Sequence, residues 1–279
     1  MIWSAGEILP DDGLKINAAD RTFEHGLGLF ETMRTWARRP VFLASHRSRM
    51  LKSAKLLHLR IDPSQLPSEQ DVARLLEADG VVEDQILRMT ASGGTESGST
   101  VWMRSRPLTG LLTSPIRLEL GSWTIHHDDP LARHKSLNYW VRRMALFHAN
   151  TLGFDETLGL SEPGLYCEGS ISNLFVVQDG AILTATLDSP IIPGLMRGFV
   201  LELAREIDLS TLEVPGFLGS SIRASDEVFL TNSVRGIVPV ARIEDQQSDL
   251  FREWPGVGPL TRLLQIRLSE RLLPGDTLP

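Results

Sequence analysis

One stretch of the sequence combines an acidic side chain with a turn that can bind an anion. Glu168 precedes the small-residue segment 169–172, which leads into an apolar strand. Farther on, Pro193-Gly194 precedes apolar residues at helical spacing, so the turn at 194–197 should present free backbone N–H groups, to which phosphate binds well. A buried acid near such a turn suggests a phosphorylated cofactor that carries a basic nitrogen. The ordinary alternative is a structural role for both features, because a Glu at a strand edge and a Pro-Gly before a helix are each common.

Lys135 can supply the amine that such a cofactor chemistry needs. Its neighbours in the sequence include Leu137, Tyr139 and Trp140, and burial among them would lower the pKa of the lysine. A neutral amine is nucleophilic toward an aldehyde. The ordinary alternative is a solvated lysine near the start of a helix or strand.

The basic segment 45–59 predicts a helix with Ser45 as its N-cap. One face carries residues at helical spacing, namely His46, Met50, Ala54 and Leu57. Arg49 is the candidate phosphate ligand of this helix, because a guanidinium binds phosphate oxygens with two parallel hydrogen bonds. Arg47 is the alternative ligand and should point elsewhere.

Two elements should position Glu168 and the helix turn. Residues 174–177 form an apolar strand, and Asp179-Gly180 predicts a two-residue hairpin that returns into residues 181–183. Other segments predict a strand at 29–33, a capped helix that begins at Ser68, and a strand through 116, 118 and 120 that ends the first domain.

Several other chemistries are disfavoured. The Gly26-Leu27-Gly28 segment lacks the third glycine of a dinucleotide fingerprint, and the loop 92–100 lacks the lysine of a P-loop. His126-His127 with Asp128 has no further histidine or cysteine at ligand spacing, so no metal site is expected. Neither HExxH nor GxSxG occurs.

Composition fits a cytoplasmic protein of two domains. The chain has 279 residues, of which 42% are hydrophobic, and it contains no run of 18 apolar residues. Its single cysteine, Cys167, and an N-terminus without a signal-peptide pattern favour a reducing compartment. The net charge of -7 argues against a nucleic-acid partner.

Taken together, the motifs resemble those of the class IV, or fold-type IV, pyridoxal-phosphate enzymes. EGSISNLFVVQDGAILTA followed by PGLMR is similar to the central family signature. Four further segments are similar to family motifs in the same order: ADRTFEHGLGLFETMRT, HRSRMLKSAKLL, KSLN and DEVFLTNSVRGIVPV. The resemblance covers nearly the whole chain. It implies an α+β protein with a small N-terminal α+β domain at 1–120, a connection at 121–134 and a C-terminal pseudo-barrel domain at 135–279.

The resemblance also assigns roles to individual residues. It implies that Lys135 is the Schiff-base lysine and that Glu168 meets the pyridine nitrogen of pyridoxal phosphate. The implied phosphate ligands are Arg49, the amides of Leu195 and Met196, and Ser233, while Tyr139 meets the phenolic oxygen. His25 and Phe30 would lie in the substrate pocket. Family members are commonly homodimers, so a homodimer that binds a small amino substrate is expected.

Two activities share this set of residues. KSLN without an extra residue resembles both the 4-amino-4-deoxychorismate lyases and the D-amino-acid aminotransferases, and TNS at 231–233 resembles the lyases more than the branched-chain enzymes. Together they favour the lyase. His25 and Leu27 depart from the family pattern, and Gly93-Gly94 stands where many relatives have Arg-Gly, so a D-amino-acid, branched-chain or amine transaminase is the alternative. A non-catalytic family member is a remote third possibility.

Overall fold

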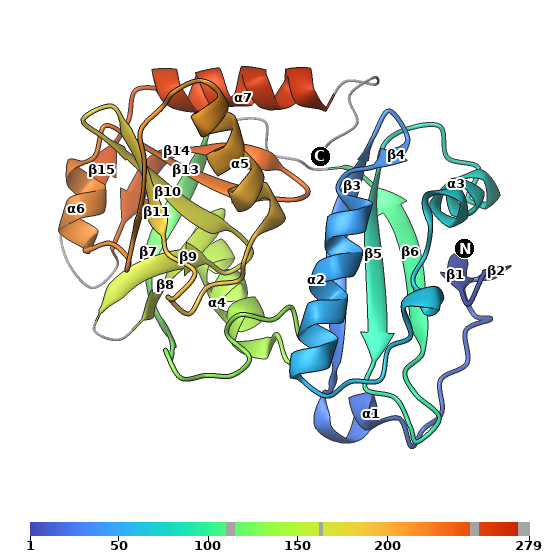
Figure 1. Ribbon diagram of the computed structural model, residues 1–279. Helices are drawn as coiled ribbons and strands as arrows, with labels where there is room; N and C mark the ends of the chain where they lie inside the picture. Colours follow the sequence, from blue (N-terminus) through green and yellow to red (C-terminus); the bar gives the residue numbers. More distant parts are fainter. Residues whose placement is uncertain (110–114, 162–163, 246–250, 273–279) are drawn as a thin grey trace. The chain divides into compact units, whose positions relative to one another are not determined.

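The chain forms two compact units (Figure 1), seen in a computed structural model that describes residues 1–109, 115–161, 164–245 and 251–272. Unit 1 comprises Met1–Gly110, His134–Tyr139 and Leu272–Pro279, and unit 2 comprises Leu111–Arg133 and Trp140–Arg271. The segment 134–139, which contains Lys135, therefore belongs to unit 1. This division differs from the predicted domain boundaries after residues 120 and 134.

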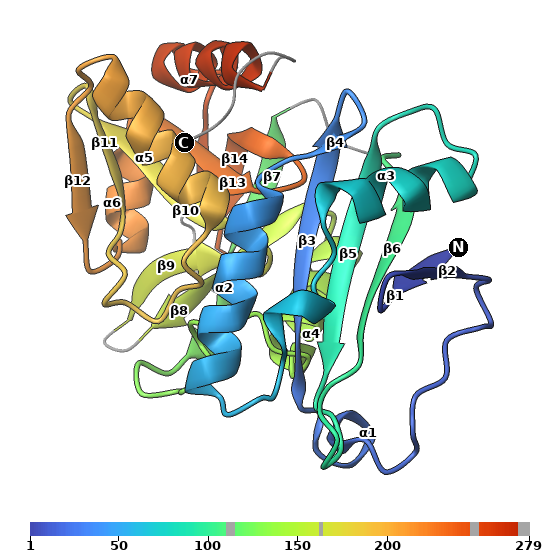
Figure 2. The same ribbon diagram turned by 45° about the vertical axis from the view of Figure 1, so that its right-hand side comes forward.

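Among the described residues, unit 1 contains a six-stranded sheet of order β2-β1-β6-β5-β3-β4. Its strands are β1 (Ile2–Ser4), β2 (Glu7–Leu9), β3 (Gly28–Trp36), β4 (Arg39–Pro40), β5 (Gln85–Ser92) and β6 (Val101–Pro107). Its helices are α1 (Arg21–His25), α2 (Leu43–Leu56) and α3 (Glu69–Ala78), with a 3₁₀ turn at Pro63–Gln65. In Figures 1 and 2, α2 lies along β3. The core between sheet and helices contains Met33, Met50, Leu75, Leu87 and Met103.

Helix α2 begins earlier than the sequence predicted. Leu43 is its first residue, and Phe42 precedes it in the left-handed conformation (φ 57°) without a side-chain cap. Ser45 is therefore not the N-cap, and that prediction was wrong. Val41 and Leu43 are both buried, and packing of these apolar side chains at the start of the helix outweighs the hydrogen bond that a serine cap would contribute.

The segment that contains Lys135 runs alongside β3 and is joined to it by backbone hydrogen bonds. The Phe30 N–H donates to the Lys135 carbonyl over 2.9 Å, and the Leu137 N–H donates to the Gly28 carbonyl over 2.9 Å. Gly28 has φ 141°, and a Cβ there would lie 2.6 Å from a Leu137 methyl carbon. A glycine at 28 thus allows the close approach that fixes the backbone of Lys135.

Unit 2 is built on a nine-stranded sheet within the described residues. Its strands are β7 (Ile116–Ile125), β8 (Glu156–Ser161), β9 (Leu165–Gly169), β10 (Asn173–Gln178), β11 (Ala181–Ala185), β12 (Thr211–Val214), β13 (Glu227–Asn232), β14 (Gly236–Glu244) and β15 (Phe251–Glu253). The pairings run β10-β13-β14-β7-β8-β9, and the pair Asn173–Glu168 joins β9 back to β10. The strands thus close into a barrel, which confirms the predicted pseudo-barrel.

Strand β7 exists as predicted but was assigned to the wrong domain. It pairs in parallel with β14 and β8 of unit 2. Ile116, Leu118 and Leu120 are all buried in the barrel core. Alternating hydrophobicity marks one buried face of a strand, but it does not say which sheet supplies the neighbours. Consequently residues 121–125, predicted as part of the domain connection, continue β7.

Four helices of the described chain belong to unit 2: α4 (Trp140–Thr151), α5 (Leu195–Glu206), α6 (Gly219–Ala224) and α7 (Pro259–Arg271). The predicted hairpin between β10 and β11 is confirmed, because Gln178 pairs with Ala181 across the two-residue turn. Asp179 and Gly180 both have positive φ (51° and 75°), as a type I′ turn requires. The helix predicted after Gly194 is α5, which is also confirmed.

Candidate active site

In unit 1, Lys135 lies beside two aromatic rings. Its Nζ is 4.6 Å from the ring centroid of Phe30 and 5.7 Å from that of Tyr139. The two rings meet edge to face with centroids 5.2 Å apart. The guanidinium of Arg88 lies 3.9 Å from the Phe30 centroid. The predicted neighbour Trp140 is instead 68% exposed, because helix α4 begins there and turns the indole toward solvent.

A buried ionic cluster joins α2 to β3. Arg49 donates to both Glu31 oxygens, from Nε over 2.8 Å and from Nη2 over 2.5 Å, and His46 Nδ1 lies 2.6 Å from Oε2. Burial acts to raise the pKa of Glu31, but the charge and hydrogen bonds of Arg49, with the hydrogen bond of His46, lower it to about 2. Burial lowers the pKa of His46. The carboxylate of Glu31 therefore holds Arg49 in a fixed orientation.

Neither Glu31 nor His46 was among the predicted site residues. The available signal was the spacing of His46 and Arg49, three residues apart on one helix face, together with an acid in the adjacent predicted strand. In the described chain, His46 Nε2 is buried and has no hydrogen-bond partner. A buried nitrogen without a partner is uncommon and marks the interior beside α2 as a place where a polar group can be accepted.

His25 occupies the last position of the short helix α1. Its side chain is 62% exposed and lies 3.7 Å from the Glu24 carboxylate. Phe30, the other residue predicted for the substrate pocket, is buried in β3 beside Lys135. The structure of unit 1 therefore brings Phe30, Tyr139 and Lys135 together, while His25 is a surface residue of the same unit.

In unit 2, the buried Glu168 of β9 has partners on both oxygens. The side chain is 2% exposed. Arg142 Nη2 donates to Oε1 over 2.5 Å, whereas Oε2 accepts from the Ile192 N–H over 3.1 Å and from Asn173 Nδ2 over 3.3 Å. Sequence reasoning missed Arg142, because one of two adjacent arginines near the start of a helix has the pattern of a solvated residue.

A second carboxylate explains the small residues between β9 and β10. Glu156 accepts hydrogen bonds from the hydroxyls of Ser170 (2.6 Å) and Ser172 (2.9 Å) and from the Ser170 and Ile171 N–H groups. A Cβ at Gly169 would lie 2.4 Å from Ser172 Oγ. This turn, held by Glu156, fixes the end of the strand that carries Glu168.

The N-terminus of α5 lies close to the Glu168 network. Gly194 caps the helix without a side-chain hydrogen bond, which leaves the first amides, those of Leu195 and Met196, suited to an external acceptor. A Cβ at Gly194 would lie 1.9 Å from Asn173 Oδ1. Asn173 thus contacts Glu168 on one side and the start of α5 on the other.

Ser233 follows β13 in a turn fixed by its neighbour. Asn232 Oδ1 accepts the N–H groups of Val234 (3.0 Å) and Arg235 (2.8 Å). Ser233 is partly buried, and the hydroxyl of Thr231, at the end of the same strand, is buried without a partner in the described chain. Hydroxyl groups of this kind can donate to phosphate oxygens.

The single cysteine adjoins Glu168 in β9. Cys167 is 1% exposed, and its sulfur lies 3.1 Å from Ser161 Oγ. Burial raises the pKa of the thiol, and the negative charge of Glu168 adds to this, against the hydrogen bond with Ser161. The thiol is therefore neutral and enclosed.

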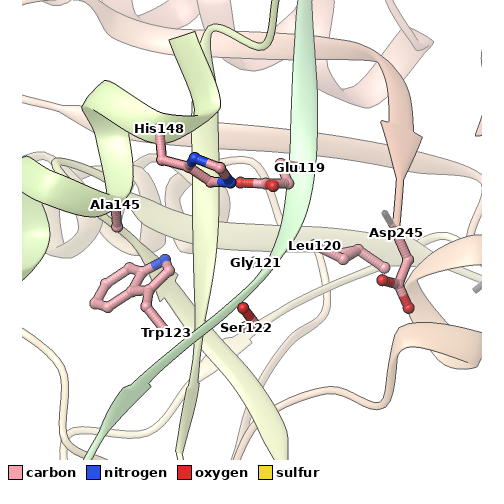
Figure 3. Close-up of a pocket in the computed structure, with 8 residues that line it drawn as sticks. All are labelled: Glu119, Leu120, Gly121, Ser122, Trp123, Ala145, His148 and Asp245. Atoms are coloured by element: carbon pink, nitrogen blue, oxygen red, sulfur yellow. The ribbon is translucent and has the colours of Figure 1, made fainter. Parts of the chain in front are cut away.

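A cavity of about 120 Å³ lies in unit 2 on β7 and α4 (Figure 3). It is lined by Glu119, Leu120, Gly121, Ser122, Trp123, Ala145, His148 and Asp245. Burial, with the charges of Asp245 and Glu119, raises the pKa of nearby Tyr166 to about 12. None of the predicted site residues lines this cavity. Trp123 connects it indirectly to Glu168, because its ring lies 5.7 Å from the guanidinium of Arg142.

Throughout the described ranges, no group of three or more His, Cys, Asp or Glu side chains could hold a metal ion. In the same part of the chain, every helix is too short or too polar to cross a membrane.

Comparison with known proteins gives consistent results. Residues 28–243 match the amino-transferase class IV family. A probable branched-chain-amino-acid aminotransferase of Thermotoga maritima is 27% identical over 267 residues, covering 95% of this chain and 93% of that protein. Aminodeoxychorismate lyase of Bacillus subtilis is 26% identical over 259 residues, covering 88% and 87%.

Solved structures with similar folds include both kinds of enzyme. The branched-chain aminotransferase of Thermoproteus uzoniensis superposes with a TM-score of 0.86 at 23% identity, covering 98% of this chain and 94% of that one. A putative 4-amino-4-deoxychorismate lyase of Legionella pneumophila gives 0.83 at 24% identity, covering 93% and 96%. At this level of identity the likeness shows the two-domain fold.

Proposed function

Since the chain belongs to the amino-transferase class IV family and is a pyridoxal-phosphate-dependent enzyme, we propose that it eliminates pyruvate from 4-amino-4-deoxychorismate to give 4-aminobenzoate. The observation that carries this proposal is the segment Lys135 to Asn138. It reads KSLN without an inserted residue, and its backbone is hydrogen-bonded to β3 on both sides of Ser136. The TNS sequence at 231–233 supports the same activity.

The residues present fit the cofactor. Gly194 leaves the start of α5 without a side chain or cap, and the buried hydroxyl of Thr231 has no partner in the described chain. We propose that Arg49, the amides of Leu195 and Met196, and Ser233 bind the phosphate. Glu168 would hold a proton at the pyridine nitrogen, and the Tyr139 hydroxyl would donate to the phenolic oxygen.

Pyridoxal phosphate, when bound, supplies an aldehyde that condenses with amines and a ring that accepts electrons from the substrate carbon. Lys135 would be the attachment point for the aldehyde, and its amine, when free, would remove a proton from the amine-bearing carbon of the substrate. The C–O bond to the enolpyruvyl group then breaks, the six-membered ring becomes aromatic, and the leaving group takes up a proton as pyruvate. The rings of Phe30 and Tyr139 lie beside this amine, with centroids 4.6 Å and 5.7 Å from Lys135 Nζ.

An aminotransferase that acts on a D- or branched-chain amino acid or an amine is the second candidate. It is supported by the branched-chain aminotransferase names of relatives such as those of Thermotoga maritima and Escherichia coli. In that reaction the amine of Lys135 would return the proton and no leaving group would be lost. The product would be a 2-oxo acid from an amino acid, or an aldehyde or ketone from an amine.

One assay separates these two activities. The purified enzyme is given aminodeoxychorismate with and without an added 2-oxo acid, and 4-aminobenzoate and pyruvate are measured. We expect equal formation of both products without an acceptor. Activity that requires a stoichiometric 2-oxo acid would contradict the lyase assignment and support the aminotransferase.

We further propose that the enzyme is a homodimer. Support comes from large apolar side chains that α4 exposes, Trp140 (68%), Val141 (61%), Met144 (51%) and Phe147 (48%), since clustered exposed apolar residues mark interaction surfaces. Sedimentation equilibrium tests this, and a monomer at micromolar concentration would refute it.

A further inference from the structure

Arg142 forms a buried ion pair with the carboxylate that we assign to the cofactor's nitrogen. Arg142 is 9% exposed and Glu168 is 2% exposed. One guanidinium nitrogen, Nη2, is 2.5 Å from Glu168 Oε1, and the other, Nη1, donates to the Gly169 carbonyl over 3.2 Å. The two hydrogen bonds attach α4 to the strand that carries Glu168 and fix the position of the positive charge.

The other groups around Glu168 in unit 2 differ from Arg142 in charge. Asn173 on β10 and the Ile192 N–H in the loop before α5 are neutral donors. Cys167, the preceding residue of β9, carries a neutral thiol. Glu156 on β8 accepts hydrogen bonds from Ser170 and Ser172 and interacts electrostatically with Arg235. Arg142 therefore supplies a full positive charge in direct contact with the Glu168 carboxylate.

The positive charge of Arg142 opposes the effect of Glu168, which is to favour protonation of a nearby basic nitrogen. A carboxylate favours protonation of a neighbouring pyridine because it is negative. A guanidinium bound to the same carboxylate neutralises much of that charge, and its own charge repels a second cation nearby. Both effects are strong at this buried site, where water screens them little.

We infer that Arg142 is a positioning residue that weakens protonation of the cofactor's pyridine nitrogen through its ion pair with Glu168. The inference rests on the proposed role of Glu168 and extends it to a residue that never needs to touch the substrate. Arg142 thus limits how strongly the ring withdraws electrons from the substrate carbon, and the enzyme's electron sink is adjustable at this position.

The experiment uses enzyme loaded with pyridoxal phosphate that is ¹⁵N-labelled in the ring. The nitrogen chemical shift is followed against pH for the parent, Arg142→Gln, Arg142→Lys and Glu168→Gln. We expect Arg142→Gln to keep the ring proton to a pH about one to three units higher than the parent, the effect of a nearby charge. Arg142→Lys retains the charge and should titrate close to the parent.

The double variant Arg142→Gln/Glu168→Gln is compared with Glu168→Gln, and each single variant is compared with the parent. Arg142→Gln leaves Glu168 buried without its counter-charge, and this variant can fail to fold for that reason. In that case the double variant is used in its place. The double variant should keep the ring proton to a higher pH than Glu168→Gln alone. Unchanged midpoints on removal of Arg142 would overturn the inference. If Glu168→Gln itself leaves the parent midpoint unchanged, the proposed role of Glu168 fails instead.

Discussion

Arg49 binds both oxygens of Glu31 at once, with Nε 2.8 Å from Oε1 and Nη2 2.5 Å from Oε2. This two-point contact fixes the plane of the guanidinium, which a single hydrogen bond would leave free to rotate. The pair also connects α2 to β3, and both elements contact the Lys135 segment. On α2, Ser53 is hydrogen-bonded to His134 over 2.8 Å, and β3 is hydrogen-bonded to the backbone of Lys135 and Leu137. The geometry of unit 1 around Lys135 thus depends on a charged Glu31.

The first prediction concerns acid stability. The folded-state pKa of Glu31, about 2, lies below its ordinary value of 4.5. A lowered carboxyl pKa contributes stability above the unfolded pKa, and that stability is lost as pH falls toward the folded pKa. Between pH 6 and pH 3 we expect the parent to lose about 2 kcal/mol more unfolding free energy than Glu31→Gln. Urea unfolding at both pH values measures this, and parallel losses would contradict it.

Arg49→Ala should weaken cofactor binding more than Arg47→Ala. Loss of a charge-assisted hydrogen bond to phosphate costs roughly 1.5–3 kcal/mol, about a ten- to hundredfold loss of affinity. Arg47 lies on the same helix and serves as the matched control. Equilibrium dialysis of pyridoxal phosphate with both variants gives the affinities, and circular dichroism checks that each is folded. Equal losses would argue against Arg49 as the phosphate ligand.

Borohydride reduction of the loaded enzyme should fix the cofactor on Lys135. The chain has four lysines, and Lys15, Lys52 and Lys55 are exposed. Lys135 is instead partly buried, with its Nζ 4.6 Å from the ring centroid of Phe30. Peptide mapping by mass spectrometry locates the label. A label on one of the exposed lysines would remove Lys135 from the proposed mechanism.

Glu168→Gln should retain the cofactor but lose about two to four orders of magnitude in rate, the usual effect of removing a positioned proton-transfer group. The amide has similar size, so the phosphate ligands of α5 remain in place. It has no negative charge with which to hold a proton at the pyridine nitrogen. Steady-state kinetics with the better substrate of the two candidate reactions measures the loss, and a fully active variant would refute the role.

Two glycines near the start of α5, the N-cap Gly194 and the helical Gly198, give a matched test of the packing at Asn173. A Cβ at Gly194 would lie 1.9 Å from Asn173 Oδ1, whereas a Cβ at Gly198 would meet nothing within 4 Å. We expect Gly194→Ala to destabilise the protein by about 1–3 kcal/mol through overpacking. Gly198→Ala should instead stabilise it by roughly 0.5–1 kcal/mol, as alanine does within a helix. Thermal or urea unfolding measures the change in unfolding free energy of each variant. Similar changes in the two variants would contradict the proposed packing.

Local interactions explain which parts of the fold the sequence could predict. The capping box of Ser68 with Asp71 and the turn at Asp179-Gly180 each involve residues at most a few positions apart. Their geometry is decided by the residues themselves, and the structure confirms both. Phe42 shows the limit, because the burial of neighbouring apolar side chains decided where α2 begins.

Long-range partners could not be predicted in the same way. The sheet to which β7 belongs depends on β8 and β14, which lie far away in the sequence. Arg142 and Glu31 have ordinary sequence contexts, and their functions follow from partners 26 and 18 residues away. Family motifs predicted Lys135 and Glu168 as site residues, but the Arg142 charge in contact with Glu168 became visible only with the structure.

The buried thiol of Cys167 offers a way to measure how often the barrel of unit 2 opens. Because the sulfur is buried and its pKa is raised, a maleimide or disulfide reagent can reach it only after β9 separates from its neighbours. The labelling rate of the native protein therefore measures the opening frequency of the strand that holds Glu168. No cysteine has to be engineered for this purpose, and a cofactor that binds at Glu168 should slow the labelling.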